Sequence, residues 1–212
     1  MIIAAADGSA LSNPGPAGWA WFIDEDCWAA GGWDHGTNNM GELMAVLDLL
    51  RQTAGSGEAL KVLCDSQYVI NSVTKWMPGW KRRGWRKADG KPVLNRDLLR
   101  DLDEALDGRD VSFEWVKGHA GHEMNERADV LARAAATAHR DGTTVDHGPG
   151  FSGAPSPSAP SPPPPFDEDL FSAMPQPEAE PSVGADPLLT ELTALTRRLL
   201  DNQVRSDPEA LA

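Results

Sequence analysis

The chain has 212 residues, with 19 basic and 32 acidic side chains, a formal net charge of −13, 17 prolines and 2 cysteines. This negative net charge argues against a nucleic-acid-binding protein, because a phosphate backbone repels acidic side chains. Two cysteines are too few for a disulfide framework. The start of the chain lacks the basic region of a signal peptide, and no stretch approaches the ~20 apolar residues that cross a bilayer. We therefore expect a soluble, cytoplasmic protein.

Charge and proline are distributed unevenly. Residues 1–140 have a net charge of −4 and residues 141–212 one of −9, and 13 of the 17 prolines follow residue 148. This division predicts one globular domain over 1–143 and a Pro-, Ser- and acid-rich linker over 144–186. A leucine pattern behind Asp186 and Pro187 predicts a short amphipathic helix over 187–204, followed by a disordered end. That helix is expected either to dock an unknown protein, to self-associate, or to have no partner.

Hydrophobic patterning predicts the elements of the domain. The first half contains a buried strand over 2–6, a hairpin of two strands over 18–33, a helix over 40–53 and a strand over 60–64. The second half contains helices over 67–76, 95–106 and 125–139, with a strand over 111–115. This order favours the α/β class, with a mixed sheet, helices on its faces and three antiparallel strands at the start.

Four acidic residues lie at positions from which their carboxylates could come together in the fold. Asp7 and Asp65 each end an apolar strand, while Glu42 and Asp129 lie in the first turns of two helices. Ligands of open α/β sheets bind beyond the carboxyl ends of the strands. Carboxylates packed closely repel one another, and a hard divalent cation, Mg²⁺ or Mn²⁺, relieves that repulsion. The alternative for any single acid is a helix cap or a loop charge.

The segment 75–91 is strongly basic, with a local net charge of +6 from seven Lys or Arg and one Asp, and it contains three Trp. Basic side chains interleaved with aromatic ones suit a surface that follows a nucleic-acid backbone. The alternative is a solvated helix that its Trp residues anchor to the core.

A glycine-rich loop over 117–122 contains His119, which could transfer protons near neutral pH. A zinc site at His119, His122 and Glu123 is the alternative. The spacing disfavours it, because zinc-binding histidines of a helical motif stand four residues apart.

In order and spacing, these residues resemble ribonuclease H of the bacterial type 1 form over residues 1 to about 140. The matching motifs are Asp7-Gly8-Ser9, Asn13-Pro14-Gly15-Pro16, Thr37-Asn38-Asn39, Glu42-Leu43, Asp65-Ser66-Gln67-Tyr68-Val69, Trp80-Lys81-Arg82-Arg83-Gly84-Trp85, Lys117-Gly118-His119-Ala120-Gly121-His122 and Asn125-Glu126-Arg127-Ala128-Asp129. One departure is Gly41 before Glu42, which on helix propensity loosens the helix start by up to ~1 kcal/mol.

The resemblance implies five mixed strands and an endonuclease that cuts the RNA strand of an RNA–DNA hybrid, leaving 5′-phosphate and 3′-hydroxyl ends. It implies that Asp7, Glu42, Asp65 and Asp129 bind two Mg²⁺ ions, with Mn²⁺ as a substitute, and that His119 assists proton transfer. We also expect the catalytic domain to be monomeric. The implied substrate-binding residues are Asn13, Thr37, Asn38, Asn39, Gln67, Trp76, Trp80, Lys81, Arg82, Arg83 and Trp85.

Two other functions fit the same residues less well. A non-catalytic hybrid-binding module would have no use for all four acids together with His119. A relative that cuts or transfers DNA strands would need a second folded domain to position its substrate, and the chain is short for one.

Overall fold

The computed structural model describes residues 1–152. The remaining predictions, which cover the rest of the linker, the helix over 187–204 and the disordered end over 205–212, lie outside the described residues.

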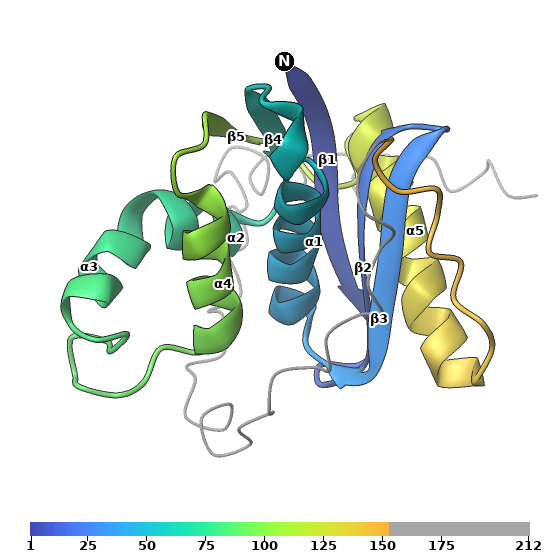
Figure 1. Cartoon of the computed structure of the whole chain (residues 1–212). Coiled ribbons are helices and arrows are strands. Elements are labelled where there is room, and N and C mark those ends of the chain that lie inside the picture. Colours follow the sequence, from blue (N-terminus) through green and yellow to red (C-terminus); the bar gives the residue numbers. More distant parts are fainter. Residues whose placement is uncertain (153–212) are drawn as a thin grey trace, which may run out of the picture. The chain divides into compact units, whose positions relative to one another are not determined.

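Five strands form one mixed sheet, as expected. The strands are β1 (Ile2–Ala10), β2 (Gly15–Asp24), β3 (Cys27–Gly36), β4 (Leu60–Cys64) and β5 (Val111–Trp115), in the spatial order β3-β2-β1-β4-β5 (Figure 1). The first three strands pair antiparallel, whereas β4 is parallel to β1 and β5 is parallel to β4. The predicted α/β class and the antiparallel start of the sheet are confirmed.

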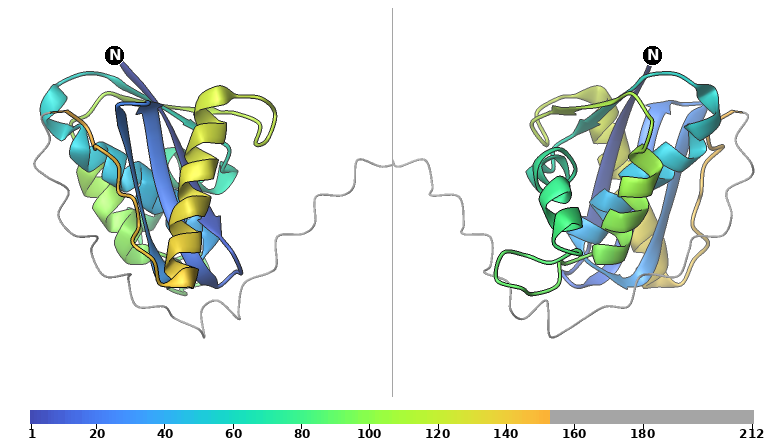
Figure 2. Two further views of the ribbon diagram at one scale, coloured as in Figure 1. Left: turned by 90° about the vertical axis from the view of Figure 1, so that its right-hand side faces the viewer. Right: turned by 60° about the vertical axis from the view of Figure 1, so that its left-hand side comes forward.

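Helices cover both faces of this sheet. They are α1 (Asn38–Gln52), the 3₁₀ turn η1 (Ala54–Ser56), α2 (Gln67–Asn71), the π-helical turn η2 (Ser72–Trp76), α3 (Met77–Arg82), α4 (Arg96–Leu106) and α5 (Glu123–Asp141). Figure 2 shows α5 on one face and α1 with α4 on the other. None of the helices within residues 1–152 is long and apolar enough to cross a membrane.

The alternation of side chains along β1 supplies both halves of the core. Ala4 and Ala6 join the cluster that contains Leu43 of α1, while Ala5 joins the cluster that contains Ala128 of α5. Successive side chains of a strand point to opposite faces, so one strand of small residues brings both helices close to the sheet.

The predicted end of the first strand is wrong. β1 continues past Asp7 to Ala10, because β2 remains paired with it as far as Ala10 opposite Ala17. The strand that ends at this level is the parallel neighbour β4, whose last residue is Cys64. Asp7 therefore lies inside a strand, on the stretch that β4 no longer accompanies.

Residues 67–76 are helical, as predicted, but they do not form one continuous α-helix, and the helical path continues beyond them. The α-helical part ends at Asn71, a π-helical turn follows, and α3 then extends the helical path to Arg82. Pro78 lies in the first turn of α3, a position where proline is tolerated.

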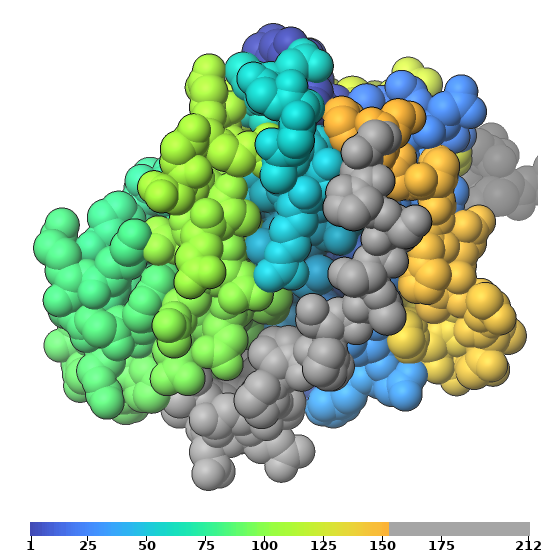
Figure 3. All heavy atoms as spheres, in the orientation of Figure 1, coloured from blue at the N-terminus to red at the C-terminus, as the bar shows by residue number. Residues whose placement is uncertain are grey.

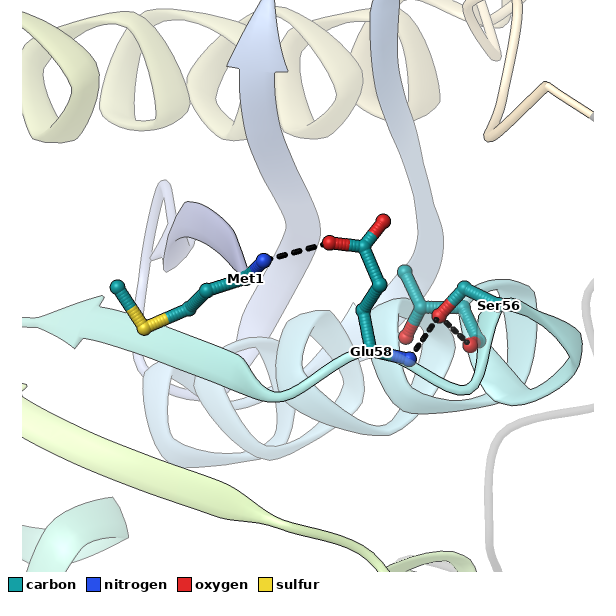
Figure 4. A network of polar contacts seen from close by, with 4 residues as sticks. Met1, Ser56 and Glu58 are labelled. Carbon is teal, nitrogen blue, oxygen red and sulfur yellow. Dashed lines mark hydrogen bonds and ion pairs between the residues drawn. The ribbon is translucent and has the colours of Figure 1, made fainter.

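A polar network ties the start of β1 to the turn before β4 (Figure 4). The N-terminal ammonium of Met1 lies 2.6 Å from Glu58 Oε2. Ser56 Oγ accepts the Glu58 N–H at 3.2 Å and donates to the Thr53 carbonyl at 2.9 Å. These contacts hold the beginnings of the two parallel strands together, where Ile2 pairs with Leu60.

Residues 144–151, which the sequence places in the linker, lie along β3 without forming a strand (Figures 1 and 2). The Ala30 N–H donates to the His147 carbonyl at 3.2 Å, and the Gly150 N–H donates to the Trp28 carbonyl at 3.0 Å. Phe151 packs against the core cluster on the α1 face. Packed chain therefore continues past the expected domain boundary at residue 143.

Candidate active site

Asp7 and Asp65 come together through the parallel pairing of β1 and β4. Ala5 pairs with Leu63, so continuing that register by two residues sets Asp7 beside Asp65. Asp7 is 6% exposed, and its Oδ1 accepts the N–H of Gly8 at 2.7 Å. The indole of Trp115, on the other side of β4, donates its N–H to the Asp65 carbonyl at 3.1 Å. The backbone of Asp65 is therefore held by β5 just after β4 ends.

Glu42 reaches the same place from the second turn of α1, not from the predicted first turn, because the helix already begins at Asn38. The Thr37 hydroxyl caps this helix by accepting the Met40 N–H at 3.2 Å. Gly41 lies against the sheet, and a Cβ there would stand 2.5 Å from the Gly18 carbonyl oxygen. Gly41 was expected to loosen the start of α1. The structure shows a different effect at the site: because Gly41 has no side chain, α1 can lie close to the sheet and bring Glu42 to it.

Two side chains hold the Glu42 carboxylate. The Ser66 hydroxyl donates to Glu42 Oε2 at 2.5 Å, and the Asn38 amide donates to Glu42 Oε1 at 2.8 Å. Glu42 is 8% exposed and Ser66 is equally buried. Both carboxylate oxygens thus have a protein donor, which favours the charged form of a buried acid.

α5 and the loop before it contribute Asp129 and His119. Asp129 lies in the second turn of α5, and its Oδ2 is 4.0 Å from Nδ1 of His119. The backbone of His119 is left-handed, with φ 51°, and its side chain is 73% exposed. His119 is therefore an accessible side chain that meets the acidic cluster at Asp129.

The four carboxylates are close enough to affect one another's protonation. Burial, followed by the charge of Asp65, raises the pKa of Asp7 to about 8, and Asp129 and Glu42 act in the same direction. Burial raises the pKa of Glu42 to about 7, although the hydrogen bonds from Ser66 and Asn38 oppose the change. Close like charges account for part of both shifts, so added positive charge would stabilise the cluster.

This donor set fits a hard divalent cation, because carboxylate oxygens are the ligands that Mg²⁺ and Mn²⁺ prefer. Buried Asn125, one turn before Asp129, also has a side-chain oxygen with no hydrogen-bond partner among the described residues. Within residues 1–152, however, no three His, Cys, Asp or Glu side chains already stand as a closed ligand set. The same holds for the alternative zinc site at His119, His122 and Glu123.

The predicted substrate-binding residues outside the basic segment, Asn13, Thr37, Asn38, Asn39 and Gln67, lie at or beside the starts of α1 and α2. Asn13 Oδ1 accepts the Asn38 N–H at 3.3 Å, which links the loop after β1 to α1. Asn39 follows in the first turn of α1, and exposed Gln67 begins α2, directly after the acidic cluster at Asp65. Thr37 is buried as the cap of α1, and Asn38 has its amide on Glu42. The structure thus assigns these two residues a role inside the domain as well.

The basic segment lies on η2, α3 and the loop after it, at the left-hand edge of Figure 3. Trp80 and Trp85 pack against the core, as the alternative interpretation expects, whereas Trp76 is 42% exposed and its ring centroid is 5.7 Å from that of Trp80. Lys81 Nζ is 2.7 Å from Asp103 Oδ2 of α4. Arg82 and Arg83 are exposed.

Ser66 and Trp115, which hold Glu42 and the Asp65 backbone, were not among the predicted site residues. The adjacency of Ser66 to Asp65 was the available signal for the first. No local signal marks the second, because it acts across the β4–β5 pairing.

Comparison with known proteins decides the family. The sequence profile of the RNase H family matches residues 1–137. The chain belongs to the RNase H family. It is 51% identical over 150 residues to "Ribonuclease H" of Tropheryma whipplei, which covers 71% of this chain and 93% of that protein. It is 47% identical over 141 residues to "Ribonuclease HI" of Streptomyces coelicolor, which covers 63% of this chain and 61% of that protein. This RNase H family member is therefore an endonuclease.

Solved structures agree with the fold. "LC9-RNase H1" is similar with a TM-score of 0.56 and 27% identity, covering 72% of this chain and 79% of that one. A foamy viral protease-reverse transcriptase in complex with RNA/DNA hybrid is similar with a TM-score of 0.57 and 19% identity, covering 63% of this chain and 20% of that one. The second likeness concerns the fold alone.

Proposed function

We propose that this RNase H family nuclease hydrolyses the RNA strand of RNA–DNA hybrids and leaves 5′-phosphate and 3′-hydroxyl ends. The observation that carries the proposal is the convergence of Asp7, Glu42 and Asp65 with Asp129 on one acidic cluster, from within β1, from the end of β4 and from the helices α1 and α5. The names of the bacterial relatives support the substrate class. Only the RNA strand offers 2′-hydroxyls as hydrogen-bonding groups, which is a physical basis for choosing it.

Two Mg²⁺ ions, with Mn²⁺ as a substitute, are the proposed cofactors, and the four carboxylates are their proposed ligands. Bound Mg²⁺ would stabilise the charge of the reacting phosphate and lower the pKa of an attacking water. The four acidic side chains can act as ligands only in their deprotonated form. The raised pKa of Asp7, about 8, means that this residue releases a proton at neutral pH when the cation binds.

His119 is the proposed proton-transfer residue. Its exposed ring reaches Asp129 and stands on a loop bounded by Gly118 and Gly121, so the ring can approach and leave the cluster. A histidine is suited to this task because its ordinary pKa lies near neutrality. The role requires that the ring donate a proton to the leaving oxygen, which becomes the 3′-hydroxyl, and then take up another proton from solvent.

The hybrid is proposed to cross two surfaces. Asn13, Asn38, Asn39 and Gln67 would contact the minor groove, and Thr37 would help to hold a DNA-strand phosphate. The basic segment would bind the DNA strand through Trp76 and through the charges of Lys81, Arg82 and Arg83, with Trp80 and Trp85 supporting them from the core. We further propose that the domain acts as a monomer in the cytoplasm.

The test is cleavage of labelled substrates. The protein is incubated with RNA–DNA hybrid, duplex RNA and duplex DNA, each with Mg²⁺ and with EDTA, and the ends of the products are analysed. We expect cleavage of the hybrid's RNA strand alone, only with Mg²⁺, and with 5′-phosphate ends. Equal cleavage of all three substrates, or hybrid cleavage that persists in EDTA, would contradict the proposal.

A further inference from the structure

Glu42 differs from the other three acids in how it is held. Asp65 and Asp129 are only partly buried, and Asp7 Oδ1 accepts its neighbour's backbone N–H. Glu42 alone has a side-chain donor on each carboxylate oxygen, from Ser66 at 2.5 Å and Asn38 at 2.8 Å. The carboxylate plane is therefore set by the protein before any cation arrives.

Resting on the function proposed above, we propose that Ser66 is a positioning residue for Glu42. The Ser66 hydroxyl has one hydrogen to donate, and that hydrogen goes to Glu42 Oε2. The Ser66 oxygen accepts the Val69 N–H at 3.3 Å, which caps α2 and fixes the direction of the hydroxyl. Each Glu42 oxygen keeps a lone pair for a cation. The two hydrogen bonds therefore orient the carboxylate and leave both of its oxygens able to bind a metal ion.

This arrangement links the elements of the site. Ser66 follows Asp65 at the end of β4, so the hydroxyl that fixes Glu42 moves with the backbone that carries Asp65. Asn38 fixes Glu42 from the side where the hybrid is proposed to bind. Groups that orient metal ligands in this way contribute about 10–100-fold to metal affinity or activity.

The experiment compares Ser66→Ala, Ser66→Thr and the control Ser56→Ala. Ser56 is a matched control because its hydroxyl also accepts a backbone N–H and donates to an oxygen, but it follows the C-terminal end of α1, whereas Glu42 lies near the start of that helix. Mn²⁺ affinity is measured from the electron paramagnetic resonance signal of free Mn²⁺. Cleavage kinetics, hybrid affinity in EDTA and thermal unfolding in EDTA are measured beside it.

For Ser66→Ala we expect Mn²⁺ affinity and kcat to fall by about 10–100-fold, with hybrid affinity in EDTA unchanged. Ser66→Thr should restore both, and Ser56→Ala should resemble the wild type. Unchanged Mn²⁺ affinity in Ser66→Ala, an equal loss in Ser56→Ala, or failure of Ser66→Thr to restore binding would overturn the assignment. A wild-type protein that neither binds Mn²⁺ nor cuts hybrid would instead refute the proposed function.

A separate observation concerns the edge of the sheet, where residues 144–151 form a strap across β3. Val145 packs on the α5 face and Phe151 on the α1 face, so the strap passes around the edge. Between these two contacts, the backbone of the strap forms hydrogen bonds with the Ala30 N–H and the Trp28 carbonyl. Phe151 N–H donates to Gln52 Oε1 at 2.9 Å, which fixes the far end. The strap lies beyond the residues matched by the family profile.

We infer that this strap prevents β3 from pairing with a strand of a second copy. An uncovered edge strand exposes a row of unpaired N–H and carbonyl groups. The strap requires glycine at two positions, since Gly148 and Gly150 both have φ 74°. A Cβ at Gly148 would lie 2.5 Å from the Trp28 carbonyl oxygen, and a Cβ at Gly150 would lie 2.8 Å from Gln52 Oε1. The full chain carrying Gly148→Val and Gly150→Val should therefore release the strap.

Hydrogen exchange and sedimentation test this inference. In the double variant, the Ala30 amide should exchange at least about 10-fold faster, because its acceptor is lost, and the protein should associate as its concentration rises. Thr144→Ala is the control, since Thr144 is exposed on the strap and its substitution leaves the backbone hydrogen bonds in place. Unchanged exchange in the double variant, or faster exchange with a sedimentation coefficient that stays monomeric at every concentration, would contradict the inference.

Discussion

Gly41 on α1 lies so close to Gly8 on β1 that a Cβ added to Gly41 would stand 3.1 Å from the Gly8 Cα and 2.5 Å from the Gly18 carbonyl oxygen. The obstructing atoms belong to backbone and cannot rotate away. Two glycines, one on each element, therefore allow the first turn of α1 to rest on the sheet and place Glu42 beside Asp7.

Gly41→Ala should destabilise the protein, although alanine is the better helix former by about 1 kcal/mol. The clash with β1 and β2 outweighs that gain, and we expect a net loss of about 1–3 kcal/mol, as for other overpacked sites. Chemical denaturation measures it. Gly55→Ala is the control, because nothing lies within 4 Å of a Cβ at that position. A Gly41→Ala protein as stable as the wild type would show that α1 can move away from the sheet.

Asp65→Asn should abolish cleavage and leave hybrid binding in EDTA nearly unchanged. The side chain is partly exposed at the end of β4, so the nearly isosteric amide preserves the fold while it removes one ligand charge. Cleavage assays with Mg²⁺ and fluorescence anisotropy with EDTA separate the two effects. Loss of folding, seen by circular dichroism, would mean that Asp65 has a structural role.

The double substitution Arg82→Ala with Arg83→Ala should weaken hybrid binding and reduce its salt dependence. Each phosphate contact contributes about 0.9 to the slope of log K against log salt, so losing two contacts lowers the slope by about 2. Binding is measured in EDTA across a salt series. Arg51→Ala is the control, because Arg51 lies at the opposite end of α1 from Glu42 and pairs with Asp101. A slope equal to that of the wild type would exclude these arginines from the phosphate-binding surface.

Asp48 should make stability depend on pH. Its carboxylate accepts hydrogen bonds from the indole of Trp21 at 2.7 Å and the amide of Gln52 at 2.8 Å, but burial outweighs them and raises the pKa of Asp48. The folded state then holds the proton more tightly than the unfolded state. This contribution to stability is complete below the unfolded pKa, about 3.9, and is lost as the pH rises through the folded pKa.

Asp48→Asn removes the buried charge while keeping an oxygen that can accept both bonds. Relative to the wild type, the variant should therefore gain stability as the pH rises above about 3.9 and through the raised pKa of Asp48 in the folded state. Thermal unfolding in EDTA at several pH values measures the difference. A stability difference that does not change with pH would contradict the raised pKa.

The order of elements and the identity of the four acids follow from the sequence. Leucines at helical spacing and alternating apolar residues identify α1, α4 and β5, because amphipathic periodicity is local information. The motifs around Asp7 and Asp65 and the charge of the basic segment are also local. They sufficed to predict the fold class and the candidate active site.

Only the tertiary structure decided how these residues are used. β1 extends past Asp7 because β2 pairs with it, and the 144–151 strap is held by β3, so both depend on partners distant in the chain. Gly41 is unfavourable in an isolated helix, yet it permits the close approach of α1 to the sheet. Ser66 acts through an oxygen of Glu42, 24 residues away. Propensity and spacing describe a chain segment by itself, whereas packing and hydrogen bonds between distant segments determine where its side chains work.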